Sequence, residues 1–570
     1  MSKQKLKARA RSAPTVVARP PLAEGEGRVL GFLKRWSVLL AVLAVGTAAA
    51  RIVSTYDELS ITTDEPGHFA GGLQYLSQHV YTYETQHPPL SRAMVALLPY
   101  LNGMRILDDD TYQNREGYKI LDHSGNPDRV VRLMRLGVLP FFLLACLVVY
   151  GWARHYFGAA AACLSVAFFT LTPQVLADGG LATTDMALAA CLGAAFFVLL
   201  LWVESPTWMH SVLLGTACAL AALSKFTALG FLPAAAVLAF AGYIIVRRPG
   251  LRGLLLSARA RILPAVLAIA VGCLLVWAAY FFSFGEVKGW DGALPAPEFF
   301  DGIRAAMAHN AEGHLSYLMG RFSTSGWWWY FPAALTFKTP IPLLLFAAPG
   351  MGLALARREA LAYLPAAFFL GVLLPSMTGH VNIGVRHILP AYLAMAILGA
   401  IALVHLLRWR GIPAAVRVAV AVMPFASMAV SATQVHPDYL AYFNALAGSK
   451  PENVLLDSNF DWGENWKLLA RRLRERGVPR VHGYGLEAQG LYPTFRRWWG
   501  LPEFFPLDPQ RFGEADPGWT VVRIAAQKQI PEKMYMPSAQ RDPWYYRVAP
   551  TERFAGFLFY RVPASSAPGR

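Results

Sequence analysis

The feature that most constrains this chain is a series of long apolar stretches separated by shorter polar ones. The 570 residues are 55% hydrophobic and only 15% charged, which excludes a soluble protein of this length. A helix that crosses a bilayer needs roughly 20 mostly apolar residues. We predict a polytopic α-helical membrane protein with about eleven spans, near residues 36–53, 132–153, 158–176, 183–203, 211–224, 227–246, 262–284, 339–356, 361–376, 388–407 and 413–433.

The basic residues indicate how these spans are oriented, because cytoplasmic loops are enriched in Lys and Arg. With the N-terminus inside, residues 1–35 form a basic cytoplasmic tail, which we expect to be disordered. An odd number of spans then places residues 434–570 outside. The basic residues lie between apolar segments and not along one polar face, so the net charge of +16 does not indicate nucleic-acid binding. The predicted inner loops contain Arg154, Arg247, Arg248, Arg252, Arg259, Arg261, Arg357, Arg358, Arg408 and Arg410.

Two outer segments and the C-terminal tail are long enough to contain a site. The outer segments comprise residues 54–131 and 285–338 of a membrane part at 36–433. Long insertions at one membrane face commonly carry function, because the spans provide a rigid frame. In the tail, helical periodicity over 464–476 predicts a small α/β or α+β domain together with strand-like stretches near 480–484, 519–524 and 554–562.

Acidic residues occur at two places on the predicted outer face. Asp64 and Glu65 follow the first apolar stretch, and Asp178 and Asp185 flank a Gly-Gly pair before the fourth. Asp64 and Asp185 both stand where a helix N-cap is expected, which is a purely structural alternative. The same carboxylates offer a general base. If Asp64, Glu65 and Asp185 converge, they can also bind a divalent cation.

Cationic side chains are sparse on the same face. Lys225 is the one charge in a tight loop, Arg386 precedes the tenth apolar stretch, and Lys338 precedes the eighth. For the two lysines the alternative is an interfacial side chain that extends its amine to water. A guanidinium such as that of Arg386 can bind two phosphate oxygens. His87 and His387 complete the set, and a neutral imidazole at residue 87 can only donate a hydrogen bond to an anion.

In their order and placement, these residues resemble the GT-C superfamily of polyprenyl-phosphate-sugar-dependent glycosyltransferases, which includes protein O-mannosyltransferases and aminoarabinose transferases. The resemblance covers about residues 36–433, and the tail is similar to that of a bacterial branch. Several relatives have lysine at the position of His87, and many have tyrosine at that of His387. The resemblance rests on Asp64-Glu65, His87-Pro88-Pro89-Leu90, Leu181-Ala182-Thr183-Thr184-Asp185, Leu223-Ser224-Lys225, Phe337-Lys338-Thr339-Pro340 and Asn382–Pro390.

The resemblance implies an enzyme of the bacterial inner membrane that moves a sugar from a polyprenyl-phosphate donor to a glycan, lipid or protein acceptor of the cell envelope. It makes Asp64 the base on an acceptor hydroxyl, with Glu65 orienting the acceptor or helping to hold a cation. Asp185 and Asp178 form a second carboxylate site. If the acceptor is itself a phosphate, no base is needed and Asp64 is positional. The residues expected to bind the donor phosphate are Lys225, Arg386, His87, Lys338 and His387.

Two other classes of protein share some of these features with the enzyme. A transporter or flippase of lipid-linked sugars needs similar cations, but transporters place charges near the bilayer midplane, whereas here they gather at one face. An envelope scaffold with a degenerate site is disfavoured by the intact Asp64-Glu65 pair with Lys225 and Arg386. No glycine-rich nucleotide loop is present on a strand-to-helix turn, so we expect neither a nucleotide-sugar donor nor a nucleotide cofactor.

Overall fold

Helices dominate the computed structural model, which describes residues 28–356, 361–409, 411, 413–485, 492–506, 515–529 and 544–563. Within these ranges, seven helical stretches are apolar and long enough to cross a membrane. The pair α9 (Ala159–Thr170) and α10 (Pro173–Gly179), bent by 70°, makes an eighth. The seven are α3 (Ser37–Ser54), α7 with α8 (Pro127–Leu136 and Leu139–Phe157), α11 (Asp185–Glu204), α13 (Ala228–Arg247), α14 (Leu251–Ala279), α19 (Ala391–Arg408) and α20 (Ala414–Gln434).

Three predicted spans form apolar helices that are shorter than a full crossing. They are α12 (Trp208–Ser224), α17 (Ile341–Leu355) and α18 (Tyr363–Ser376), with 17, 15 and 14 residues. Each of the predicted apolar segments therefore coincides with an apolar helix, although fewer than eleven have the length of a complete span. The chain is a multi-pass membrane protein.

The N-terminal prediction is partly corrected. Residues 28–35, assigned above to a disordered tail, form helix α2 (Arg28–Arg35). Leu30 on this helix is 2% exposed, so burial of an apolar side chain stabilises it. Residues 1–27 lie outside the described part of the chain, as do Arg357, Arg358 and Arg410 of the predicted inner loops.

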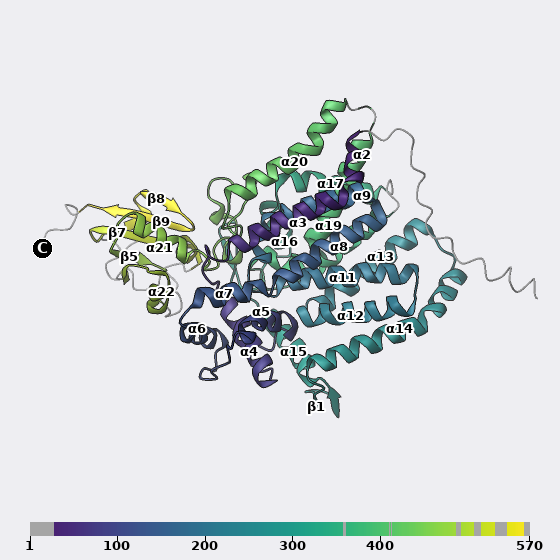
Figure 1. Cartoon of the computed structure of the whole chain (residues 1–570), viewed down its shortest axis with the longest axis horizontal. Helices are drawn as coiled ribbons and strands as arrows, with labels where there is room; N and C mark the ends of the chain where they lie inside the picture. Colours follow the sequence, from purple (N-terminus) through teal and green to yellow (C-terminus); the bar gives the residue numbers. More distant parts are fainter. Residues whose placement is uncertain are drawn as a thin grey trace, which may run out of the picture.

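The first outer segment folds into three helices at the end of the helical bundle nearest the C-terminal sheet (Figure 1). These are α4 (Glu65–Gln78), α5 (Pro89–Leu101) and α6 (Gln113–His123). The second outer segment contains helices α15 (Pro297–Glu312) and α16 (Tyr330–Lys338). It also forms two hairpins, β1 (Phe284–Glu286) with β2 (Ala293–Pro295), and β3 (Ser316–Leu318) with β4 (Arg321–Ser323).

The C-terminal region contains a five-stranded sheet in the order β6-β5-β7-β9-β8. β5 (Arg480–Tyr484) is parallel to β6 (Glu503–Pro506) and β7 (Gly518–Arg523), whereas β9 (Phe557–Val562) is antiparallel to β7 and to β8 (Glu552–Phe554). All three predicted strand regions are present, as β5, β7 and β9, and β6 and β8 are additions. The helices of this region are α21 (Trp466–Glu475), which matches the predicted periodicity, α22 (Tyr492–Trp499) and α23 (Ile524–Gln529).

The segment that precedes α21 is bonded to the membrane part. The Ser60 amide donates to the Glu464 carbonyl at 2.8 Å, and the Thr63 amide donates to the Trp462 carbonyl at 3.0 Å. The Ser60 hydroxyl in turn accepts from the Trp466 amide at 2.9 Å. The chain just before Asp64 therefore runs directly beside residues 462–466, so the tail contributes to the surroundings of the predicted site.

Candidate active site

Four of the predicted residues form one connected group of charges. Arg386, in the 3-10 turn η1 (Val385–Ile388), places Nη2 3.3 Å from Asp64 Oδ2 and Nη1 3.3 Å from Asp185 Oδ2. Lys225, directly after α12, donates from Nζ to Asp185 Oδ1 at 2.6 Å. The fold thus joins residues separated by up to 322 positions in the sequence. The shared guanidinium makes the two carboxylates one electrostatic unit.

The helix-cap alternative is excluded for both carboxylates. Asp64 is the N-cap residue of α4 and Asp185 is the first residue of α11, but neither helix has a side-chain hydrogen bond at its N-cap. The carboxylate of Asp185 is buried and directed to Lys225 and Arg386. The Lys225 side chain is 7% exposed, so its amine is paired and does not extend to water.

Asp64 is the accessible member of the group. Its side chain keeps 35% of its surface exposed, against 7% for Arg386 and 0% for Asp185. Burial raises the pKa of the Asp64 carboxyl to about 6, although the positive charge of Arg386 opposes this shift. Asp64 therefore changes charge close to neutral pH and is open to a ligand, which are the properties required of a general base.

Glu65, the neighbour of Asp64, is enclosed by the protein. Its carboxylate forms a bidentate pair with Arg135, at 2.8 Å to Nε and 2.9 Å to Nη2, and both residues are 0% exposed. The amides of Thr62 and Ala182 donate to it at 2.7 and 2.8 Å. Burial alone would raise the pKa of Glu65, but these partners lower it instead. The structure does not support the predicted contact of Glu65 with an acceptor or a cation.

We expect Glu65→Gln to lower the free energy of unfolding by about 3–5 kcal/mol, because it leaves the buried Arg135 charge without its partner. Thermal unfolding in detergent measures this loss. Glu58→Gln is the matched control, since the Glu58 side chain is 40% exposed in its pair with Arg471. Unchanged stability together with lost activity would instead indicate that Glu65 contacts substrate.

Lys338 has a different environment from the one predicted. Its amine is buried and donates to the carbonyl oxygens of Leu440, Tyr442 and Asn459 at 2.6, 2.5 and 2.7 Å. An ammonium group has three donors, so all are used. Burial also lowers the pKa of Lys338 to about 7. These three contacts hold the start of the tail against the end of α16 and leave the amine no further donor for the predicted phosphate.

The remaining predicted residues lie around Arg386 and Asp185. Asp178, on the short helix α10, accepts from Gln174 Nε2 at 2.8 Å and is close enough to Asp185 for their charges to interact. His387 follows Arg386, and burial lowers its pKa well below the ordinary value. The imidazole is therefore neutral at pH 7, and its buried Nε2 has no hydrogen-bond partner among the described residues.

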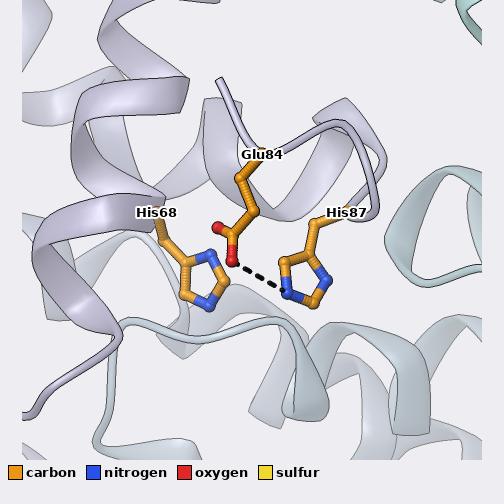
Figure 2. Close-up of side chains that lie close together, drawn as sticks. All are labelled: His68, Glu84 and His87. Carbon is orange, nitrogen blue, oxygen red and sulfur yellow. Dashed lines mark ion pairs between the residues drawn. The ribbon is translucent and has the colours of Figure 1, made fainter. Parts of the chain in front are cut away.

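His87 belongs to a small group in the first outer segment (Figure 2). Its Nε2 is 3.8 Å from Glu84 Oε1, and its ring lies edge to face with that of His68, with centroids 5.1 Å apart. Burial lowers the pKa of both imidazoles well below the ordinary value, so both rings are neutral. His68 and Glu84 were not predicted, because a single histidine and a single glutamate have no distinctive spacing.

The tail adds two contacts to Arg386 that the sequence analysis missed. Ser458 Oγ accepts from Arg386 Nε at 3.0 Å and donates to the Ile383 carbonyl at 2.9 Å. The guanidinium carbon lies 3.9 Å from the centre of a ring of Trp462, in a cation–π arrangement. The available signal was the dense polar and aromatic run at 457–462. Arg386 is thereby fixed on its buried side while it reaches the two carboxylates.

The divalent-cation site left open above at Asp64, Glu65 and Asp185 does not fit this geometry. Glu65 is paired with Arg135, and the oxygens of Asp185 point to Lys225 and Arg386. Cationic side chains thus occupy the position that a metal ion would need. The group is better suited to bind an anion that approaches Arg386 from the side of Asp64.

Residues 125–277 match the model of a family described as dolichyl-phosphate-mannose-protein mannosyltransferase. The matched part includes Asp178, Asp185 and Lys225 and extends from the start of α7 to near the end of α14. No curated protein sequence gives a match to this chain.

Solved structures match over a larger part of the chain. ArnT from Cupriavidus metallidurans in the apo state has a TM-score of 0.50 and 15% identity, covering 93% of this chain and 99% of that chain. The same protein bound to undecaprenyl phosphate has a TM-score of 0.48, with the same identity and coverage. Archaeal oligosaccharyltransferase AglB from Archaeoglobus fulgidus, in complex with an inhibitory peptide and a dolichol-phosphate, has a TM-score of 0.48 and 13% identity, covering 86% of this chain and 70% of that chain. The fold class predicted from the sequence is confirmed by the first of these matches, and the chain shares the fold of ArnT in the apo state.

Proposed function

We propose that the chain is a glycosyltransferase that moves a sugar from a polyprenyl-phosphate donor to an acceptor of the cell envelope. The observation that carries this proposal is the contact between an accessible carboxylate, Asp64, and a fixed guanidinium, Arg386, at 3.3 Å. Transfer to a hydroxyl needs a base near the nucleophile and a cation near the departing phosphate. Here Asp64 can serve as the base and Arg386 as the cation, and their side chains are 3.3 Å apart.

In the proposed reaction, Asp64 accepts the proton of an acceptor hydroxyl while the hydroxyl oxygen attacks the anomeric carbon of the sugar. The bond between that carbon and the phosphate oxygen breaks, and polyprenyl phosphate leaves with the electron pair. A single displacement inverts the anomeric configuration. Arg386 stabilises the charge that develops on the leaving phosphate, as expected for a cation preorganised at the reacting centre.

The distances suggest different roles for the two cations. Charge-assisted N–H to carboxylate bonds are usually about 2.7–2.9 Å long. Both contacts of Arg386 to carboxylates are longer, at 3.3 Å, whereas Lys225 is 2.6 Å from Asp185. We therefore assign phosphate binding chiefly to Arg386. Lys225 holds the carboxylate of Asp185, and that carboxylate positions Arg386. Asp178 and His387 lie beside these residues.

The placement of these charges favours an enzyme over a transporter. Asp64 and Asp185 stand at helix starts, Lys225 at a helix end, and Arg386 in the turn before α19. Charges at helix ends suit a reaction at the membrane surface. In the orientation predicted from the basic loops, this surface is the outer face of the bacterial inner membrane, with the C-terminal region on the same side.

The test is sugar transfer by the purified protein in liposomes, with labelled polyprenyl-phosphate sugars and a crude envelope fraction as acceptor. We expect label to move from lipid to acceptor. Labelled lipid that crosses the bilayer equally well in the wild type and in Asp64→Asn, without transfer, would reject the enzyme and support the transporter.

The pH dependence of kcat/KM should show the ionisation of Asp64. Only the carboxylate accepts a proton, and its pKa is raised to about 6. Activity should therefore fall by about tenfold per pH unit below this value and level off above it. A donor with a phosphodiester link keeps its charge over this range, so the change is not due to the donor. A flat profile between about pH 5 and 8 would argue against Asp64 as the base.

A further inference from the structure

A second group of functional side chains begins one helical turn from Asp64 and is not used by the proposed reaction. It consists of His68 on α4, Glu84 in the connection between α4 and α5, and His87 just before α5. The three side chains direct their ligand atoms toward one another (Figure 2), all within 4.8 Å. In the described part of the chain, no other group of three or more His, Cys, Asp or Glu side chains converges in this way.

Two nitrogen atoms of this group lack hydrogen-bond partners. Nδ1 of His68 and Nδ1 of His87 are both buried, and neither is bonded to another described residue. Buried polar atoms are nearly always satisfied, so each exception requires an explanation. A bound ion would account for Nδ1 of His68. It would bind His87 through Nε2, the nitrogen that faces Glu84, so Nδ1 of His87 does not count as support for the site.

We propose that His68, Glu84 and His87 bind a divalent metal ion of the zinc class. Two histidines and one glutamate form a known ligand set for zinc, and they leave a fourth position for water or substrate. Ligand atoms around a tetrahedral zinc ion lie about 3.3 Å apart. One pair here, His87 Nε2 and Glu84 Oε1, is separated by 3.8 Å, and all three ligand atoms lie within 4.8 Å of one another. Binding therefore needs the side chains to close by at most about 1.5 Å.

The group is accessible to an ion from outside. The side chains of Glu84 and His87 are 20% and 22% exposed, whereas His68 is 2% exposed. His68 therefore provides a fixed inner ligand, and the other two can adjust around the ion. Gln86 donates to Glu84 Oε1 at 3.1 Å, and this weak contact is the one that the metal ion would replace.

A neighbouring cation, Arg92, does not prevent metal binding. Its Nη2 is 3.4 Å from Glu84 Oε2, a long contact for an ion pair. The guanidinium is held mainly by carbonyl oxygens, at 2.8 Å to Tyr83, 3.1 Å to Glu84 and 3.3 Å to Gly67. Arg92 therefore keeps its place when Glu84 turns toward a metal ion.

The surrounding charges indicate which ligand completes the site. The carboxylates of Asp64, Asp185 and Glu84 are paired with Arg386, Lys225 and Arg92, so a divalent ion adds positive charge that favours an anionic fourth ligand. The charges of Lys225, Asp185 and Arg386 lie close enough to act on His87. The donor phosphate is the anion expected there, and this step rests on the proposed function.

Metal analysis of the intact protein in detergent tests the site without any activity assay. After removal of metals with a chelator and addition of Zn²⁺, we expect about one tightly bound ion per chain by mass spectrometry. His87→Gln and Glu84→Gln should each weaken binding by at least about tenfold. Co²⁺ in place of Zn²⁺ should give the visible absorption of a tetrahedral site in the wild type and not in these two variants.

The matched control is His123→Ala, which removes an exposed histidine of the same outer segment. This variant should bind the metal as the wild type does. Gel filtration and thermal unfolding select the variant, His87→Gln or Glu84→Gln, that remains folded. Equal Zn²⁺ affinity in the wild type and the folded ligand variant would reject the site.

A separate titration tests the link to the donor. Polyprenyl phosphate without a sugar should raise the affinity of the wild type for Zn²⁺, and by linkage Zn²⁺ should raise the affinity for the lipid to the same extent. Zn²⁺ bound with unchanged affinity in the presence of lipid would reject the phosphate as ligand. If Zn²⁺ binds but no sugar is transferred in the liposome assay, the metal site stands and the proposed function fails.

Discussion

Replacing Asp64 with Asn is expected to lower kcat/KM for sugar transfer by about 10²–10⁴-fold, the usual contribution of a general base. The amide has nearly the same shape as the carboxylate, but it cannot accept the proton of the acceptor hydroxyl. Asp64 does not cap α4 with its side chain and keeps 35% of that side chain exposed. The variant should therefore fold normally, with only a small change in its unfolding temperature.

Transfer rates in liposomes at pH 8, with saturating donor, measure this effect. Asp109→Asn is the matched control, because this carboxylate lies in the same outer segment and is 58% exposed in its pair with Lys119. We expect the control to retain wild-type activity. A loss of less than about tenfold in Asp64→Asn would remove the role of base. Asp64 would then be positional, as expected if the acceptor is a phosphate.

The second large effect is expected for Arg386→Lys, with a fall in kcat/KM of about 10²–10³-fold. Lysine keeps the charge but has no planar fork, so it cannot contact Asp64, Asp185 and a phosphate together. It also loses the contact from Nε to Ser458 Oγ at 3.0 Å. Because the phosphate acquires charge during transfer, the loss should appear in kcat more than in KM.

Arg386→Met gives a second readout that a purely structural role would not produce. The charge of Arg386 lowers the pKa of Asp64, so its removal should move the acidic limb of the pH profile to higher pH. Arg304→Lys, an exposed arginine on α15 that is paired with Asp301, is the control. Wild-type kcat in Arg386→Lys would show that the guanidinium does not stabilise the leaving group.

The helices of the membrane part were predictable because apolar runs are a direct consequence of the bilayer. Every predicted segment has a matching helix, and the boundaries differ by a few residues in most cases. The sequence did not indicate how many residues of each apolar segment are helical. Proline at residue 375 lies in the last turn of α18, and the helix ends at 376, so the apolar run there gives 14 helical residues. Apolar composition alone does not distinguish this short helix from a full span.

The site was predictable in part. Asp64, Asp185, Lys225 and Arg386 were expected on one face, and the structure brings them into contact. Where the structure differs from the prediction, it differs in the groups that a site residue contacts. Lys338 is satisfied by three backbone carbonyls, which leave no mark in the sequence.

The sequence does contain an indication that Glu65 is paired with a cation. Arg135 is a charge at the beginning of an apolar run, where an arginine requires a partner in the protein. Glu65 is that partner. By contrast, His68 and Glu84 have no recognisable spacing relative to His87, so only the fold could show that they meet.

The contacts of Arg386 and Lys338 with the tail have a consequence for the timing of synthesis. Ser458 and Trp462 hold Arg386, and Lys338 binds carbonyls as late in the chain as Asn459. A nascent chain therefore has an incomplete candidate active site, here called the centre, while its transmembrane helices are being inserted. The centre closes only after residues 458–462 have left the ribosome and folded against Asp64 and Arg386, so a chain that stops earlier is inserted but has no assembled centre.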